Sequence, residues 1–132
     1  MFSVLRADQP TVSPAYKILA SNTETIDSLA KLPAVVRITL IGKIGTTADR
    51  GEKFSEDCLG SDPHRRFIQA GHSSDYWWIH YETGGRAHFS SVIIYEIKDQ
   101  KAVFYTECYS GVFSPDFDKL LASIKSNPEK RK

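Results

Sequence analysis

An α+β domain is the fold that this sequence predicts: an antiparallel β-meander of about four to five strands, with an N-terminal helix and a C-terminal helix packed on one face. Two observations predict it. Four runs rich in β-branched and aromatic residues follow one another between residues 66 and 109, joined by turns too short for βαβ crossovers. A helix start at Ser114-Pro115 then precedes apolar residues at helical spacing. The 132 residues suit a single domain over 1–132, long enough to bury a core.

The sheet is predicted from runs of strand-forming residues bounded by turn residues. We expect strands over about 66–70, 76–82, 86–97 and 102–109. The turns between them are predicted at 71–75, at Thr83-Gly84-Gly85 and at Asp99-Gln100. Glycine supplies the positive φ that tight hairpins need, which makes the second of these a hairpin loop.

Helices are predicted on both sides of the meander. Asn22 and Thr23 offer an N-cap for a short helix over about 23–31. In the C-terminal helix, one apolar stripe must bury against a face of the sheet, and its members are Phe117, Leu120, Leu121 and Ile124.

Residues 32–44 fit two structures. Their many β-branched residues favour a strand. Alternatively, Pro33 stands near the start of a second helix, in which Leu32, Val36 and Leu40 would share one stripe.

The remaining segments are predicted to lack regular structure. Residues 1–22, punctuated by proline, are predicted as an extended arm with its apolar residues laid on the domain. Residues 45–63 are predicted as a long surface loop anchored by Phe54 and Leu59, and 127–132 as a frayed tail.

Charge and composition exclude several classes of protein. Lys and Arg number 17 and Asp and Glu 16, so the net charge of +1 argues against extended tracking of nucleic acid. No stretch approaches the ~18 consecutive apolar residues of a membrane span, and the N-terminus lacks the apolar region of a signal peptide. We therefore expect no membrane association and a cytoplasmic location for the chain as written, or a periplasmic one if a leader was removed.

The cysteines leave one question open. A disulfide between Cys58 and Cys108 would require an oxidising compartment, and the sequence does not decide whether they pair. Neither cysteine lies in a zinc-ligand spacing, and we expect no metal and no cofactor.

The length of the hairpin loop decides which side chains share a face of the sheet. A loop of Thr83-Gly84-Gly85 pairs Glu82 with Arg86 and His80 with His88. A shorter Gly84-Gly85 loop would bury His80 and Glu82 among apolar residues, so the longer loop is favoured. One face is then apolar and suits the C-terminal helix; it carries Trp77, Ile79, Tyr81, Ala87, Phe89, Ser91, Ile93, Tyr95, Ile97, Ala102, Phe104, Thr106 and Cys108. The other face gathers Tyr76, Trp78, His80, Glu82, Arg86, His88, Ser90, Tyr105, Glu107 and Tyr109.

This polar and aromatic face suggests two kinds of function. Exposed together, its aromatic rings would form a patch typical of binding surfaces, unless the N-terminal arm or residues 32–44 cover them as a second core layer. General acid–base catalysis with anion stabilisation uses the residue types found at His80, Glu82, Arg86 and His88. The structural alternative is a cross-strand ion pair between Glu82 and Arg86 at the hairpin tip.

A pattern in the middle third of the chain resembles one found in small uncharacterised bacterial proteins. It comprises Arg65-Arg66-Phe67-Ile68-Gln69-Ala70-Gly71, then Trp78, then Tyr81-Glu82-Thr83-Gly84-Gly85. The resemblance implies a bacterial source and a shared fold, and it implies no activity.

Together these observations favour a non-enzymatic, partner-binding protein, such as an inhibitor or a toxin-immunity protein. Its expected contact residues are Tyr76, Trp78, His80, Glu82, Arg86, His88 and Tyr105. The alternative is a small hydrolase of ribonuclease type with Glu82 as base, His88 or His80 as acid and Arg86 as phosphate clamp. Nucleic acid is expected only as the substrate of that alternative. An exposed aromatic sheet face would also serve a homodimer.

Overall fold

The computed structural model of the chain describes residues 13–54, 63–85, 88–126 and 129–130. In chain order its elements are α1 (Pro14–Ala20), β1 (Glu24–Ile26), the 3₁₀ helix η2 (Leu29–Lys31), α2 (Ala34–Ile44), β2 (Thr47–Ala48), β3 (Arg65–Ser73), β4 (Tyr76–Thr83), β5 (Phe89–Lys98), β6 (Lys101–Ser110), α3 (Phe117–Ser126) and β7 (Glu129–Lys130).

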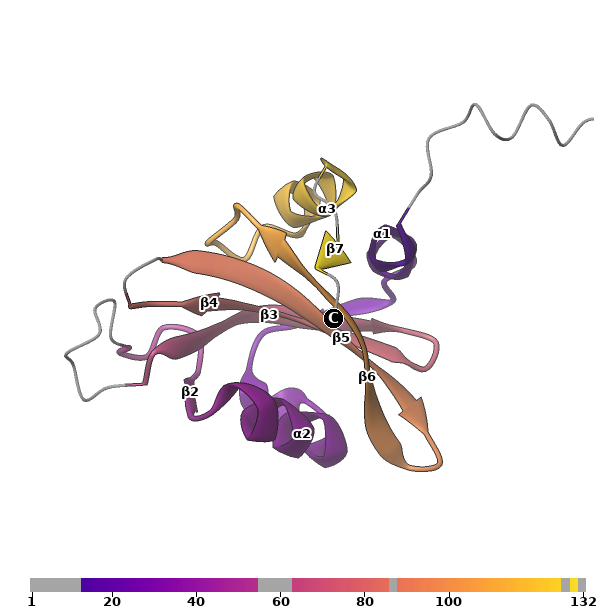
Figure 1. Cartoon of the computed structure of the whole chain (residues 1–132), viewed down its shortest axis with the longest axis horizontal. Helices are drawn as coiled ribbons and strands as arrows, with labels where there is room; N and C mark the ends of the chain where they lie inside the picture. The colour runs from indigo at the N-terminus through magenta and orange to yellow at the C-terminus, as the bar shows by residue number, and fades with distance from the viewer. Residues whose placement is uncertain (1–12, 55–62, 86–87, 127–128, 131–132) are drawn as a thin grey trace, which may run out of the picture.

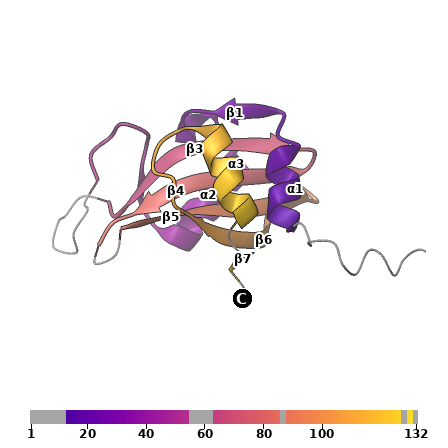
Figure 2. The ribbon, with the colours of Figure 1, turned by 90° about the horizontal axis from the view of Figure 1, so that it is seen from above.

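The described strands form one sheet with helices on both faces (Figure 1). The sheet has seven strands in the order β1-β3-β4-β5-β6-β7, with the short β2 paired in parallel to β3. Strands β3 to β6 form an antiparallel meander, which confirms the predicted α+β class. Helices α1 and α3 lie together across one face, as the view from above shows, and α2 lies beneath the other (Figures 1 and 2).

The N-terminal helix begins earlier than the sequence suggested. Residues 14–20, predicted as part of an extended arm, form α1. The Ser13 hydroxyl caps it by accepting from the Tyr16 backbone N–H at 3.1 Å, and Pro14 occupies the first turn, where a missing N–H is tolerated. Ala15, Ile18 and Leu19 are its buried residues, so the helix is held by packing on the sheet.

The helix predicted over 23–31 is absent from the structure, which has β1 and η2 there instead. The Thr23 N–H donates to the His72 carbonyl at 2.8 Å, which starts the pairing of β1 with β3. The Asp49 carboxylate then accepts from the Ser28 hydroxyl at 2.7 Å and from the Leu29 N–H at 3.0 Å. These long-range contacts satisfy polar groups that a local helix would otherwise have paired.

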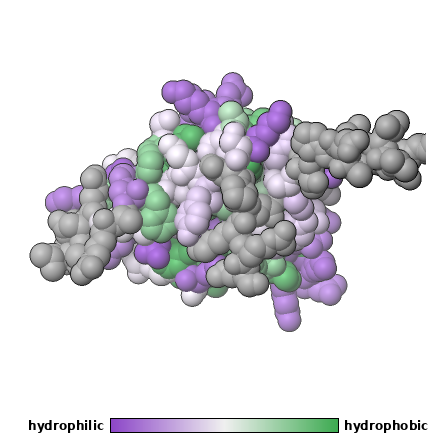
Figure 3. Space-filling model, turned by 45° about the horizontal axis from the view of Figure 1, so that its top comes forward, coloured by the Kyte–Doolittle hydropathy of each residue, from purple (hydrophilic) through white to green (hydrophobic). Residues whose placement is uncertain are grey.

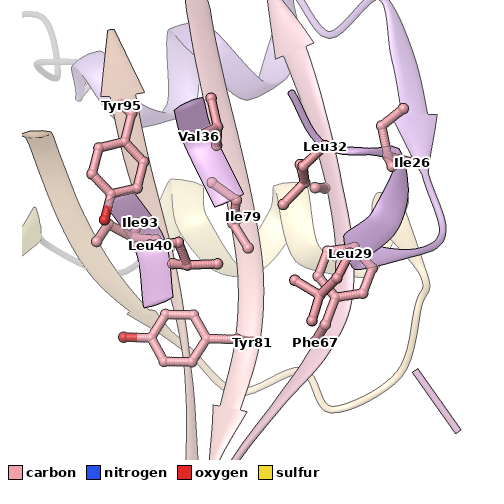
Figure 4. Packing of buried hydrophobic residues seen from close by; sticks show 11 residues of the cluster. Ile26, Leu29, Leu32, Val36, Leu40, Phe67, Ile79, Tyr81, Ile93 and Tyr95 are labelled. Carbon is pink, nitrogen blue, oxygen red and sulfur yellow. The ribbon is translucent and has the colours of Figure 1, made fainter. Parts of the chain in front are cut away.

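Residues 34–44 form helix α2, which settles the choice left open by the sequence. The stripe of Leu32, Val36 and Leu40 is buried, with at most 3% of each residue exposed. In Figure 4, Val36 and Leu40 lie beside Ile79 and Ile93 of the sheet, within one apolar cluster. Burial of the helical stripe outweighs the strand preference of its β-branched residues.

The β4–β5 hairpin keeps the predicted faces but not the predicted pairing. Glu82 pairs with Ser90 and His80 with Val92, four positions further along β5 than expected, and the pairing of the two strands ends at Thr83 and Phe89. An even shift leaves every side chain on its face. Asp99 and Gln100 form a two-residue turn between the paired residues Lys98 and Lys101, as predicted, and both turn residues have positive φ.

The C-terminal helix packs on the opposite face from the one predicted. Leu120 and Ile124 of α3 cluster with Trp78, Val92 and Ile94, on the face expected to be polar. Helix α2 covers the apolar face instead. The sequence therefore carries two apolar layers, and both faces of the meander are core.

The structure also tests predictions made for single residues. The Asp116 carboxylate, not Ser114, accepts the N–H of Lys119 at 3.1 Å at the start of α3. Glu129 and Lys130, predicted as part of a frayed tail, pair with β6. Phe54 is buried as expected for a loop anchor, whereas Leu59 lies outside the described residues. Within the described ranges, no helix is long and apolar enough to cross a membrane.

Candidate functional site

Part of the face predicted to bind a partner is buried in the structure. Trp78 is 0% exposed and lies in the apolar cluster that α1 and α3 form over the sheet. Its indole N–H donates to the Asn22 side-chain oxygen at 3.0 Å, and its ring lies 5.5 Å from that of Phe117. Trp78 is therefore a core residue, and part of the predicted N-terminal arm covers it.

His80 is equally buried, at 0% exposure, and both ring nitrogens are occupied. Nε2 lies 2.8 Å from the Val112 carbonyl and must donate to it, because a carbonyl oxygen only accepts. Nδ1 then accepts from the Gln69 amide at 3.2 Å. Burial lowers the pKa of His80 to about 4, although the Val112 hydrogen bond and the Glu82 charge oppose this shift. The ring is neutral and holds the segment after β6 against the sheet.

Glu82 stands at the end of β4 in a cluster of charged groups. Its side chain is only 4% exposed, and its two carboxylate oxygens have different partners. Oε2 accepts from Nε of Arg66 at 2.9 Å, and Oε1 lies 2.8 Å from Nε2 of His88. A buried carboxylate is tolerable because it is paired in this way. The structure thus brings together two of the predicted catalytic residues, Glu82 and His88, while Arg86 lies outside the described residues.

Aromatic rings support the partners of Glu82. The Arg66 guanidinium lies 4.1 Å from the centre of the Phe54 ring, a cation–π geometry. The His88 ring lies 4.5 Å from the Phe113 ring and 6.1 Å from the Phe54 ring. The side chain of His88 remains 40% exposed, so the cluster reaches the surface through it.

A surface pocket of about 210 Å³ adjoins this cluster, lined by Arg50, Gly51, Arg66, Phe67, Ile68, Glu82, Phe113 and Pro115. Sequence reasoning missed Arg50 and Arg66 as site residues. A β-bulge between Phe67 and Gln69 lets Arg66 pair with Glu82 and Gln69 with His80 on one face, against strict alternation. Nothing in the sequence marks that bulge.

The aromatic part of the predicted face survives at the other end of β4. Tyr76 is half-buried and Tyr105 is 40% exposed, and their rings meet edge to face at 5.1 Å. A hollow of about 300 Å³ lies between them and α1, lined by Pro14, Lys17, Ile18, Tyr76 and Tyr105. Figure 3 views the molecule with the side of α1 and α3 brought forward, where both hydrophobic and hydrophilic residues reach the surface.

Two predicted members of the face, Glu107 and Tyr109, lie on the other side of the sheet. Strand β6 carries a β-bulge: Ile94 of β5 pairs with Thr106 and Tyr95 pairs with Phe104, so Tyr105 is an extra residue of β6. Every later residue of β6 therefore lies on the face opposite to the one predicted. Glu107 accepts from the Tyr81 hydroxyl at 2.7 Å beneath the sheet, and Cys108 moves in the opposite sense into the α1–α3 cluster. Cys58 lies outside the described residues.

Neither a metal site nor a comparison with known proteins identifies a function. Among the residues that the structure describes, no three His, Cys, Asp or Glu side chains gather as metal ligands would. Comparisons with protein-family models, curated proteins and solved structures found no match.

Proposed function

We propose that this chain is a bacterial partner-binding protein, such as an inhibitor or a toxin-immunity protein, and that its partner docks on the hollow between α1 and β6. One observation carries the proposal: Tyr76 and Tyr105 form an accessible aromatic pair beside a hollow of about 300 Å³. Glu96 of β5 pairs with Tyr76 on one side and with Val103 on the other. Val103 adds an apolar side chain that is 44% exposed.

These residue types suit a protein partner. Tyrosine buries a large area at small entropic cost and is enriched at the centres of interfaces. Lys17 lines the same hollow, so complementarity favours a partner with an apolar side chain next to an acidic one. Trp78 packs in the same apolar cluster as Ile18 and Tyr76, which line the hollow.

Affinity capture from bacterial lysate with matched variants tests the proposal. A specific partner should bind the wild type and be lost from Tyr105→Ala, with affinity reduced on the order of 30-fold if Tyr105 is a hot spot. Tyr109→Ala is the control, because Tyr109 is 46% exposed on the opposite face of the sheet. If the Tyr105 and Tyr109 variants retain the same proteins as the wild type, the hollow is not the docking surface.

A second candidate, a small hydrolase of ribonuclease type, is favoured by the 2.8 Å contact between Glu82 and His88. A carboxylate that orients a half-exposed histidine is a common acid–base arrangement. Arg66 would take the clamping role expected of Arg86, and the neutral, enclosed His80 would take no part. RNA cleavage by the wild type that His88→Ala abolishes would support this candidate, and equal cleavage by both proteins would reject it.

A further inference from the structure

We propose that the pocket beside Glu82 binds a phosphoryl group, held between the guanidinium groups of Arg50 and Arg66. This inference does not rest on partner binding, and it concerns binding alone, so it stands whether or not the site hydrolyses anything.

The described residues that line the pocket carry more positive than negative charge. Among them are the two arginines Arg50 and Arg66 and one carboxylate, that of Glu82. Arg66 is paired with that carboxylate at 2.9 Å, whereas no carboxylate of the described residues lies within ion-pair distance of Arg50. Asp49 and Glu52 belong to the same turn, but they do not line the pocket and instead accept from backbone N–H groups. The charge of Arg50 acts on Asp27, which does not line the pocket, and it remains available to an anion that enters the pocket.

Both guanidinium groups are fixed before any ligand arrives. Nε of Arg50 donates to the Ile68 carbonyl at 2.8 Å, at the β-bulge of β3. Arg66 donates to Glu82 and, through Nη1, to the Glu52 carbonyl at 3.0 Å, and it stacks on Phe54. A guanidinium has five N–H donors, so each arginine keeps donors beyond these contacts. Side chains held in this way lose little entropy on binding.

The size and lining of the pocket indicate the chemical class of the ligand. A volume of about 210 Å³ equals the liquid volume of about seven waters, enough for a phosphoryl group with part of its ester substituent. Paired guanidinium groups match the several oxygens of phosphate, with charge-assisted bonds. The Phe113 ring, which is 42% exposed, borders the pocket and offers a stacking surface for a base. A nucleotide is the ligand that uses all three features.

Arg50 is the residue to change, because its side chain is exposed and bonds only to a backbone carbonyl within the described chain. Arg66 is a poorer choice, since its removal would leave the Glu82 carboxylate buried with one partner fewer and destabilise the fold. Arg37→Gln is the matched control: it removes the same charge from an arginine that donates to the Leu32 carbonyl at the start of α2.

The test is a titration of the whole chain, followed by the NMR signals of the arginine Nε–H groups and of the Gly51 amide. The probes are inorganic phosphate and adenosine 5′-monophosphate. We expect saturable shifts at Arg50, Arg66 and Gly51, with a Kd on the order of 1 mM for phosphate and tighter for the nucleotide. Arg50→Gln should weaken binding by about tenfold or more, and Arg37→Gln should leave it unchanged.

The outcomes separate the parts of the proposal. Equal affinity for phosphate and nucleotide would support the phosphoryl site and remove the role given to Phe113. Unsaturable shifts, or equal affinity of Arg50→Gln and the wild type, would overturn the proposal. Binding without RNA cleavage would reject the hydrolase candidate and leave the phosphoryl site intact.

Discussion

The buried histidine of β4 makes the stability of this protein depend on pH in a definite direction. His80 is fully buried, its Nε2–H donates to the Val112 carbonyl, and burial lowers its pKa from 6.5 to about 4. In the unfolded chain the same ring titrates near its ordinary value. As the pH falls below 6.5, the unfolded state takes up a proton that the folded state refuses, so folding is progressively disfavoured.

The size of the effect follows from the two pKa values. Each unit of difference corresponds to about 1.4 kcal/mol. From the neutral His80 alone, we expect the free energy of unfolding to fall by about 2 kcal/mol between pH 7 and pH 5, and by about 3 kcal/mol by pH 4. The contribution is fully present above pH 6.5 and is lost as the pH falls toward 4.

Urea unfolding followed by tryptophan fluorescence at several pH values measures this loss. His80→Gln removes the titrating group while keeping a side-chain donor for Val112, so its stability should change less between pH 7 and pH 5. His72→Gln changes a histidine of β3 and leaves His80 in place, so this variant should still lose the His80 contribution of about 2 kcal/mol between pH 7 and pH 5. If the wild type and His80→Gln lose the same free energy over this range, the assignment of a neutral, enclosed ring is wrong.

Two further substitutions test the packing. Gly71→Ala would put a Cβ 2.6 Å from the Trp78 ring and 2.6 Å from the Glu24 carbonyl, so we expect a loss of about 1–3 kcal/mol in urea unfolding. Gly42→Ala has nothing within 4 Å and should instead stabilise helix α2 by up to about 1 kcal/mol; equal effects would contradict the close approach at Gly71. Leu40→Ala, at a residue 0% exposed, should cost about 2–5 kcal/mol in the same assay, and a cost below 1 kcal/mol would show that α2 is not a core helix.

The periodic parts of this fold could be predicted from the sequence. Strand alternation placed His80, Glu82 and Ser90 on one face, and the even register shift of the hairpin did not disturb that assignment. The Asp99-Gln100 turn and the apolar stripe of α3 were predicted for local reasons that the structure bears out. In each case a short-range pattern determines the structure.

Features that depend on long-range contacts could not be predicted. A single extra residue at each of two bulges reverses alternation, which brings Arg66 to Glu82 and sends Glu107 to the opposite face. The face expected to be exposed to solvent is covered, because α1 and α3 pack on Trp78. The prediction assumed that one face of the antiparallel sheet is polar and solvated, and that assumption was wrong. A buried carboxylate such as that of Glu82 is expected to pair with a cationic side chain, because an unpaired buried charge is costly. The sequence does not identify which cationic side chain pairs with it.

The two proposed surfaces lie at opposite ends of β4 and should act independently. Tyr76 begins the strand and Glu82 stands near its end, so about six residues of strand, roughly 20 Å, separate the aromatic hollow from the phosphoryl pocket. Trp78 and His80 fill the interval, and neither reaches the surface. Sites this far apart with no shared partner normally give additive free energies. Arg50→Gln should therefore leave capture of the protein partner unchanged, and Tyr105→Ala should leave the phosphate titration unchanged. If phosphate binding responds to Tyr105→Ala, the buried row between the two sites transmits a change, and the interior of β4 is less rigid than its packing implies.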